Sequence, residues 1–411
     1  GYMAVSDSTA EQGSWPSIFL IYAIGVLGAT TISQVIPVIG QLAGIFRAGP
    51  LVGWIISLPS ALVAVGALLT GWIVDRIGDK RVLLAGSAIV VLGDIGAALA
   101  STLPMLLTMR IVEGVGYVGI GVAAITMMIR ITQGPRRNLA LTLWSSFIPM
   151  SFALPFLVAG PLSQPGRWPW AFTGHAIVLG ALLIVGFAQL PARGSEPVAS
   201  RNVGLAAVLR SPGPYVLGLC FACAAFVQTG VVSTLPHLLS SRYGVSIAEA
   251  SSVGTAGMLL NILGCLAVGP LLNRGVRPLS IAVGGVCFTI AAGVTLGLAL
   301  PGFSAAAAVS CAFFFGAGLI VGLWALLPIV APGRHSLGAT SGMVTQLTLW
   351  GVLFGPPAAF AAQAGGQWLP EARNIIIASL TIVLCIWLVV RKFSHSAGDQ
   401  RTVGQQLPSA H

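Results

Sequence analysis

Long, continuous runs of apolar residues are the feature of this sequence that most restricts its fold. A hydrocarbon core of about 30 Å is crossed by roughly 20 apolar residues in an α-helix. On that scale the sequence predicts an all-α membrane protein with twelve spans, over residues 16–38, 50–74, 82–101, 104–129, 138–160, 169–190, 213–239, 246–272, 278–300, 303–328, 337–362 and 369–390. The runs are continuously apolar, which argues against the alternating strands of a membrane barrel.

Composition excludes a water-soluble protein. Of the 411 residues, 56% are hydrophobic and 7% are charged, whereas soluble domains carry about 25% charged residues. A net charge of +10 would suggest a nucleic-acid partner in a soluble protein. Here the basic residues are scattered between apolar runs, and this distribution is typical of membrane topology. We therefore expect a lipid bilayer as the surroundings and no nucleic acid as a partner.

The positive charges also predict the orientation. If the amino terminus is cytoplasmic, 15 of the 20 basic residues fall on the cytoplasmic side and Arg110 lies inside a helix. The outer loops hold four: Arg47, Arg167, Arg242 and Arg373. By the positive-inside rule both termini are cytoplasmic. Residues 1–14 lack the basic start of a signal peptide, so the first helix is expected to stay as an anchor. We expect a multi-pass protein of the plasma membrane, of the bacterial inner-membrane type.

Residues 191–212 form the longest polar interruption and divide the spans into six and six. Gly160-Pro161 near the end of the fifth span recurs as Gly355-Pro356 near the end of the eleventh, which indicates an internal repeat. We predict two pseudo-symmetric six-helix bundles, with a tail over 1–15, bundles over 16–190 and 213–391, a linker over 191–212 and a second tail over 392–411. Two such halves around a midplane cavity form a known transporter plan.

Two motifs carry a resemblance to a known family. The loop after the second span reads G-x3-D-R-x-G-x-K-R, with Gly71, Asp75, Arg76, Gly78, Lys80 and Arg81. The fourth span contains Arg110-x-x-Glu113-Gly114-x-Gly116. Together with the twelve spans, these motifs resemble the major facilitator superfamily of transporters, in which Gln is usual at the position of Glu113. The resemblance covers essentially the whole chain.

A weaker similarity concerns one branch of that family. Leu143-Trp144-Ser145 faintly resembles the cyanate and nitroimidazole permeases. That branch often has an arginine in the first helix, where this chain has Gln34-Val35-Ile36-Pro37 instead. No substrate follows from this similarity.

The resemblance implies that the loop motif is a conformational latch. Its glycines permit a tight turn, and Asp75 can accept hydrogen bonds from the amino end of a neighbouring helix or pair with an arginine. Such a latch would hold the two halves together at the cytoplasmic face and release them during transport. The alternative is that Arg76, Lys80 and Arg81 only enforce the topology.

Three charged residues lie well inside predicted helices, and they carry the chemistry. Asp94, Arg110 and Glu113 fall at similar depth, and a charge there costs several kcal/mol unless it pairs or lines a wet cavity. Arg110 and Glu113 share a helix face. Two acids facing one arginine leave one acid to exchange a proton, so we assign proton coupling to Glu113, with Asp94 as the alternative carrier and Arg110 contacting substrate. The alternative is a structural Asp94–Arg110 pair.

The resemblance implies cavity walls from the first, fourth, seventh and tenth spans. Each polar candidate can also be a helix-packing residue. His175 is interpreted as one, with titration near neutral pH as the alternative. Since the second half has no embedded arginine or lysine, the solute is expected to be neutral, monoanionic or amphipathic. The candidate lining residues are Arg110, Thr30, Thr31, Gln34, Gln228, His237, Asn261, Gln346 and Trp350.

The sequence therefore favours a proton-coupled secondary transporter, a monomer that moves a small organic solute by symport. Drug or metabolite efflux by antiport is the alternative, although Pro149 and Pro155 do not fit the G-x3-G-P-x2-G-G frame of drug–proton antiporters. A receptor or an enzyme on this scaffold would need a catalytic dyad or a soluble domain, and neither is visible. No cofactor is expected, because the G-x-G-x-x-G at residues 114–119 lies within a span. No metal site is assigned, although a soft-metal role for Cys220 and Cys223 stays open.

Overall fold

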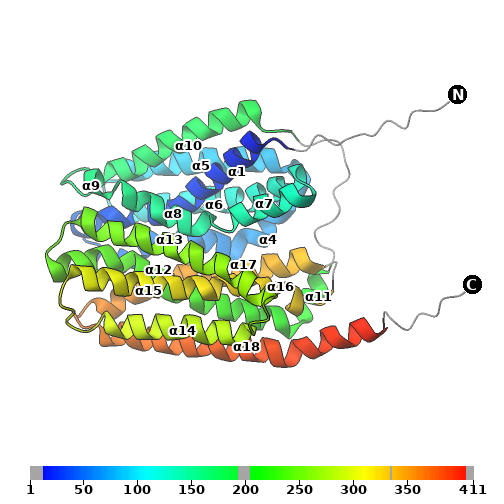
Figure 1. Cartoon of the computed structure of the whole chain (residues 1–411). Coiled ribbons are helices and arrows are strands. Elements are labelled where there is room, and N and C mark those ends of the chain that lie inside the picture. Colours follow the sequence, from blue (N-terminus) through cyan, green and yellow to red (C-terminus); the bar gives the residue numbers. More distant parts are fainter. Residues whose placement is uncertain (1–12, 193–203, 334–335, 404–411) are drawn as a thin grey trace, which may run out of the picture.

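The structure, a computed structural model, describes residues 13–192, 204–333 and 336–403. The described residues form helices and turns and no strands. The parts of the predicted tails and linker at 1–12, 193–203 and 404–411 lie outside this range. In Figure 1, the start of α1 and the end of α18 lie at the same end of the bundle. We call this end the terminal end and the opposite one the distal end.

The described residues contain eleven helices or helix groups long and apolar enough to cross a membrane, and twelve when the pair α7 and α8, bent by 46°, is taken as one span. This confirms the all-α class and the predicted set of spans. The first six use α1 (Trp15–Ser33), η1 (Ile36–Val38), α2 (Ile39–Ile45), η2 (Gly49–Leu51), α3 (Val52–Ser57), α4 (Ser60–Ile77), α5 (Asp79–Ala98), α6 (Leu103–Ile131), α7 (Gly134–Trp144), α8 (Phe147–Leu157), α9 (Ala159–Leu162) and α10 (Pro169–Gln189).

The second six spans follow a short helix at the terminal end. They use α11 (Leu205–Arg210), α12 (Pro212–Tyr243), α13 (Ile247–Asn273), α14 (Pro278–Thr295), α15 (Phe303–Gly322), η3 (Leu323–Leu326), α16 (Leu327–Val330), α17 (Leu337–Gln363) and α18 (Leu369–Val403). Figure 1 shows α1 to α10 gathered in one half of the molecule and α11 to α18 in the other.

Small residues let helices within each half approach closely. A methyl group at Gly116 in α6 would overlap the carbonyl oxygen of Gly86 in α5. The same relation holds between Gly316 in α15 and Gly285 in α14, which stand 200 and 199 residues further along the chain. Backbone contact through glycine is a common way to pack membrane helices. Its repetition at matching positions indicates that the two halves are copies of one plan.

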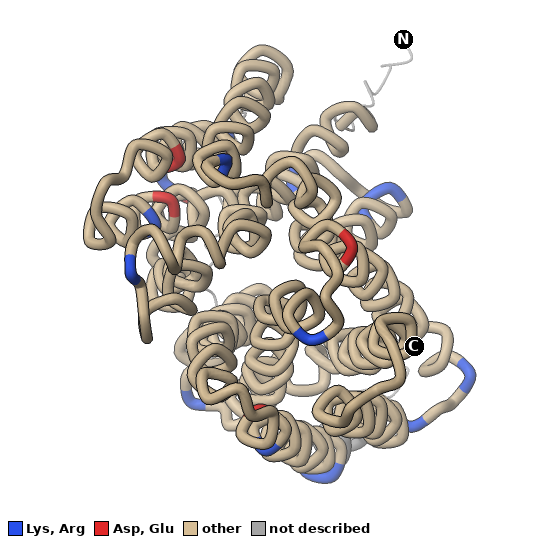
Figure 2. Tube along the Cα trace, turned by 90° about the vertical axis from the view of Figure 1, so that its left-hand side faces the viewer, with Lys and Arg blue, Asp and Glu red and all other residues tan. Residues whose placement is uncertain are grey.

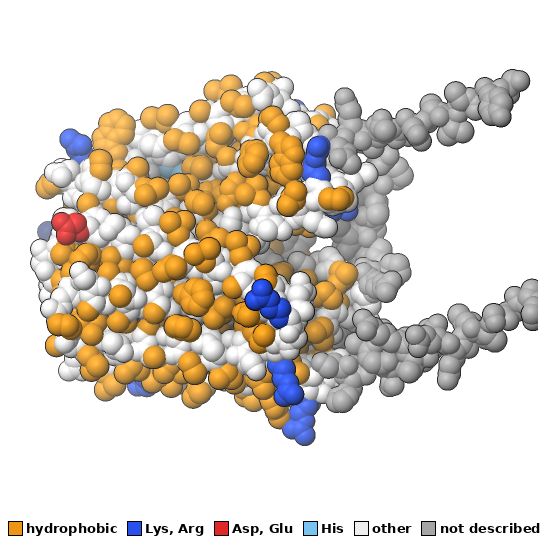
Figure 3. All heavy atoms as spheres, viewed as in Figure 1, with side chains coloured by type: hydrophobic (Ala, Val, Ile, Leu, Met, Phe, Trp, Pro, Cys, Tyr) orange, Lys and Arg blue, Asp and Glu red, His pale blue; other side chains and the backbone are white. Residues whose placement is uncertain are grey.

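The outer surface suits a bilayer. In the side view of Figure 3, hydrophobic side chains cover the middle of the visible face, and most charged side chains lie toward its two ends. Figure 2, seen from the distal end, shows few charged positions along the trace. Large apolar side chains such as Leu69, Phe187 and Leu369 are exposed, as expected where lipid takes the place of water.

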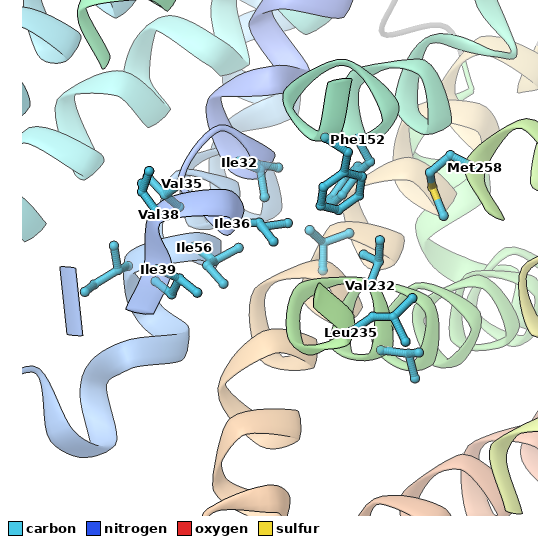
Figure 4. Packing of buried hydrophobic residues seen from close by; sticks show 14 of the residues in the cluster. Ile32, Val35, Ile36, Val38, Ile39, Ile56, Phe152, Val232, Leu235 and Met258 are labelled. Carbon is cyan, nitrogen blue, oxygen red and sulfur yellow. The ribbon is translucent and has the colours of Figure 1, made fainter. Parts of the chain in front are cut away.

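The two halves meet closely at the distal end. Thr255 in α13 donates a hydrogen bond of 3.3 Å to the carbonyl oxygen of Ala153 in α8. A side chain at Gly53 in α3 would overlap the backbone of Pro357 in α17. Figure 4 shows side chains of both halves in one buried apolar cluster, including Phe152 and Val232. These contacts join the two halves at the distal end.

Candidate functional site

A buried ion pair in α6 is the centre of the candidate site. Arg110 and Glu113 have no solvent exposure, and Arg110 Nη1 lies 2.6 Å from Glu113 Oε2. Their three-residue spacing places both side chains on one face of the helix. The pair is therefore neutral as a unit, which is how a charge is accommodated at this depth.

The other donors of Arg110 reach carbonyl oxygens at breaks in neighbouring helices. Arg110 Nε donates to Ile55 O at 2.7 Å, and Nη2 donates to Ile56 O at 3.1 Å and to Ile32 O at 3.4 Å. Residue 59 would donate to Ile55 O in an unbroken helix, but it is a proline and has no N–H. The interruption of the helix between α3 and α4 thus leaves a carbonyl oxygen without its helical donor, and the guanidinium of Arg110 donates to it.

Gln34 joins this pair to a second carboxyl group. Its Nε2 atom donates to Asp94 Oδ1 at 3.1 Å and to Glu113 Oε1 at 3.3 Å. Asp94 is fully buried and Gln34 is 3% exposed. The Gln34 Oε1 atom has no hydrogen-bond partner among the described residues. The structure therefore brings together four predicted residues: Gln34, Asp94, Arg110 and Glu113.

His175 in α10 is the member of this group that the sequence did not identify. Its Nδ1 atom lies 2.6 Å from Asp94 Oδ2, and its Nε2 atom lies 2.6 Å from the carbonyl oxygen of Leu27 in α1. The sequence interpretation of His175 as a packing residue overlooked both contacts. The available signal was depth, because a lone histidine six residues into an apolar span lies level with Asp94. We call Gln34, Asp94, Arg110, Glu113 and His175 the polar cluster.

Other predicted lining residues form a smaller group in the second half. Asn261 in α13 donates through Nδ2 to Gln228 Oε1 at 3.2 Å and to the carbonyl oxygen of Phe314 at 3.0 Å. In the first half, Thr31 is fully buried and its hydroxyl has no partner among the described residues. Thr30 donates to the carbonyl oxygen of Val26 at 2.7 Å within its own helix.

Three candidates lie away from both groups. His237 is exposed at the distal end and lines a cavity of about 80 Å³ with Pro37, Gln41 and Ser163, between α12 and the first span. Gln346 Oε1 accepts a hydrogen bond of 3.4 Å from the backbone of Leu68. Trp350 is 39% exposed and stacks against Phe354.

The predicted latch residues lie around the turn between α4 and α5. Gly78 has φ +98 in this turn, a conformation that favours glycine. Lys80 Nζ donates to the carbonyl oxygens of Phe187 at 3.2 Å and Leu190 at 2.6 Å at the end of α10. Gly71 and Asp75 lie in α4, Arg76 lies 4.4 Å from the centre of the Trp72 ring, and Arg81 is exposed in α5.

The motif contains one further acid that the sequence did not single out. Asp79, the first residue of α5, makes a two-point ion pair with Arg130 at the end of α6, with distances of 2.7 and 3.0 Å. Arg130 also donates to the carbonyl oxygen of Pro191 at 3.0 Å. These bonds tie α5, α6 and the end of α10 together within one half.

The chain matches the family model of the Major Facilitator Superfamily over residues 18–356. Among solved structures, a bacterial homologue of the human lysosomal transporter Spinster, in an inward-facing and occupied conformation, aligns with a TM-score of 0.67. That alignment covers 97% of this chain and all of the other at 17% identity, so it supports the fold alone.

Curated relatives differ in the solutes that their names state. The 3-(3-hydroxy-phenyl)propionate transporter of Escherichia coli K12 is 28% identical over 364 residues, covering 81% of this chain and 84% of that protein. The arabinose-proton symporter of the same strain is 30% identical over 141 residues, or 34% of this chain and 29% of the symporter. The multidrug export protein EmrB of Haemophilus influenzae is 26% identical over 174 residues, or 42% and 34%. The chain thus spans about a third or less of the last two proteins.

Proposed function

Because the chain belongs to the major facilitator superfamily, we propose that it is a proton-coupled secondary transporter that moves a small organic solute by alternating access. The observation that carries this proposal is the polar cluster. It places two carboxyl groups, Asp94 and Glu113, and one arginine in a buried position where an unpaired charge is costly. A carboxyl group that gains or loses a proton there changes the charge balance of the whole group.

The polar cluster is also connected, through hydrogen bonds and helix packing, to the contact between the two halves. Arg110 ties α6 to the carbonyl oxygens of α1 and α3. In turn α3 packs against α17 of the other half at the distal end, where Gly53 meets Pro357. A change of charge in the cluster alters the bonds of Arg110, and thereby the position of the helix that helps join the halves at the distal end. Proton exchange and solute access are coupled in this way.

The solute class follows from the weak charge of the polar side chains buried in the second half. Among them is the uncharged amide pair Gln228 and Asn261, so a neutral, monoanionic or amphipathic solute fits best. Uptake by symport is favoured, in line with the name of the arabinose-proton symporter. The similarity to EmrB supports efflux by antiport as the second candidate. We place the protein as a monomer in the bacterial inner membrane, with both termini cytoplasmic.

Reconstitution into liposomes with an imposed pH gradient tests the proposal. The probes are arabinose, 3-(3-hydroxyphenyl)propionate and ethidium, which represent a neutral, a monoanionic and a cationic solute. Accumulation of a probe down an inward proton gradient supports symport, and its exclusion supports antiport. The matched control is Pro104→Ala, which changes the first turn of α6 without altering a charge of the cluster. Solute flux that is indifferent to the pH gradient would overturn proton coupling.

A further inference from the structure

The hydrogen bonds of His175 determine where one proton of the cluster lies. A backbone carbonyl can only accept, so the contact with Leu27 O requires a hydrogen on His175 Nε2. The other nitrogen, Nδ1, lies 2.6 Å from Asp94 Oδ2, and this contact also needs a hydrogen. Either Nδ1–H donates to a carboxylate, or protonated Asp94 donates to Nδ1. In both forms Asp94 and His175 share one proton in addition to the hydrogen on Nε2.

Glu113 is held differently. Its Oε2 atom accepts from Arg110, and its Oε1 atom accepts from Gln34. Both oxygens face donors, which favours the ionised carboxylate. The carboxyl group of Asp94 is a further hydrogen-bond partner of Glu113. The charge of the Glu113 carboxylate cancels that of Arg110. The cluster is therefore neutral when Asp94 and His175 share their proton, and it carries one negative charge when that proton leaves.

We propose that Asp94 and His175 together hold the proton that the transporter exchanges, while Glu113 remains the counter-ion of Arg110. This inference rests on the proposed function and assigns the proton within it. On release, the N–H or O–H bond between the two groups breaks and the proton passes to water. Neutral His175 keeps its Nε2 hydrogen, and Asp94 is left as a carboxylate. Burial opposes the resulting net charge, so release requires access to water from one side.

Among the elements packed around His175, one other acid lies at this depth, Glu113 on α6, and it is paired with Arg110. On α10 itself, His175 is the titratable residue, and on α1 the tyrosine Tyr22 bonds to Ser146 at 2.7 Å. On α6 the neighbours are Arg110, Glu113 and the buried Tyr117. The remaining charged residues of α5 lie at its terminal end, namely Asp79, Lys80 and Arg81.

The first test is nitrogen NMR of protein labelled with ¹⁵N-histidine in lipid. The signal of His175 is identified by its loss in His175→Gln. We expect Nε2 to carry a hydrogen throughout the range in which histidine titrates. In Asp94→Asn, which keeps His175, the hydrogen shared at Nδ1 should be lost. A hydrogen-free Nε2 in the wild type, or an Nδ1 signal unchanged in Asp94→Asn, would overturn the shared proton.

The second test counts protons without any solute. Proton uptake by the protein in nanodiscs is followed with the dye pyranine as the pH is lowered. Asp94→Asn and His175→Gln should each bind one proton fewer than the wild type, and the double variant should also bind one fewer rather than two. The control, Thr108→Ala, changes an exposed side chain outside the cluster that does not titrate. Additive loss of two protons would show two independent groups.

The outcomes separate the two proposals. If His175→Gln still accumulates a probe to the wild-type level under the pH gradient, the assignment of the proton is wrong while proton-coupled transport stands. If the wild type moves none of the probes in response to the gradient, proton-coupled transport is overturned, and so is the exchange role of this pair. The NMR result then reports a shared proton with a structural role.

Discussion

At the scale of single residues, Arg110 is the best-connected side chain of the site. Three of its four hydrogen bonds reach carbonyl oxygens in two helices, α1 and α3, and the fourth reaches the carboxylate of Glu113. Such a set offsets the large cost of taking a guanidinium out of water. The same set makes the site sensitive, because removing one partner leaves other groups buried without theirs.

Replacing Arg110 with glutamine leaves Glu113 without its counter-charge. Breaking one side of a buried ion pair costs about 3–5 kcal/mol, so the free energy of unfolding in mixed micelles should fall by roughly that amount. The double variant Arg110→Gln/Glu113→Gln restores neutrality and should recover part of the loss. Equal stability of the single and double variants would contradict this account.

The sequence predicted the pairing of the two charged residues within α6 better than the contacts between different helices. Arg110 and Glu113 share a helix face because of their spacing alone, and this relation is local. The contact between Asp94 and His175 joins residues 81 positions apart, and it depends on how α5 and α10 are rotated about their axes. Nothing in one apolar span reports its rotation against another. The depth of His175 in its span was readable from the sequence, but its contact with Asp94 was not.

At the scale of elements, the contacts of the site depend on where the spans are interrupted. The second span breaks before Pro59, and the freed carbonyl oxygen of Ile55 accepts from Arg110. The span boundaries followed from hydropathy, but the use of this break did not. A proline predicts that one backbone N–H is missing, but it does not indicate which side chain donates to the carbonyl oxygen left without a partner.

Replacing Pro59 with alanine returns an N–H that can bond to Ile55 O. We expect the helix to become continuous across residues 57–60 and the bond to Arg110 Nε to weaken. The rate of gradient-driven transport should fall several-fold while the protein stays folded. Pro104→Ala is the control, because Pro104 lies in the first turn of α6, where a proline removes no helix bond. Comparable transport in both variants would show that the break has no such role.

The bend in the fifth span was not predicted, and its cause is visible in the structure. Ser145 and Ser146 bond through their hydroxyls to the carbonyl oxygens of Thr142 at 2.6 Å and Leu143 at 2.7 Å. Pro149 lacks the N–H that would reach Ser145 O. Side-chain bonding of this kind and a proline one turn later both bend helices. The two serines and the proline are visible in the sequence, but a hydropathy profile averages over a whole span and does not report a bend.

At the scale of the whole molecule, two halves of one plan meet at the distal end. The Cβ atom that a side chain would add at Gly160 lies 3.5 Å from the Cβ atom of Ala248. The first belongs to α9 and the second to α13, so this contact joins the halves. Alternating access requires that such contacts separate in each cycle.

A disulfide at this contact should block transport. The Cβ separation of 3.5 Å falls in the range that disulfides adopt. In Gly160→Cys/Ala248→Cys, oxidation should reduce gradient-driven transport to background, and a reductant should restore it. The two single variants are the controls, since the chain also has six native cysteines. Full transport after complete oxidation would mean that the distal contact does not need to open.

A second change at this end acts by crowding. A side chain at Gly53 would overlap the backbone of Pro357, so Gly53→Val should favour states in which the distal ends of α3 and α17 are apart. Spin-label distances between the two halves at the distal end measure this shift. Gly44→Val is the control, because a side chain at Gly44 would meet nothing within 4 Å. An unchanged distance distribution in Gly53→Val would contradict the prediction.

The cluster also has a consequence for how the chain is made. Arg110 and Glu113 enter the bilayer on the same helix, so their charges are neutralised as soon as that helix forms. Asp94 enters earlier on α5, but its partner His175 is synthesised 81 residues later. Between these two moments the nascent chain has made Gln34, which donates to Asp94, but the histidine that shares the proton is still missing. The hydrogen bonds of the polar cluster are therefore complete only when the sixth span has been inserted. Ribosome-bound chains that end before α10 should be the ones that quality-control proteases remove.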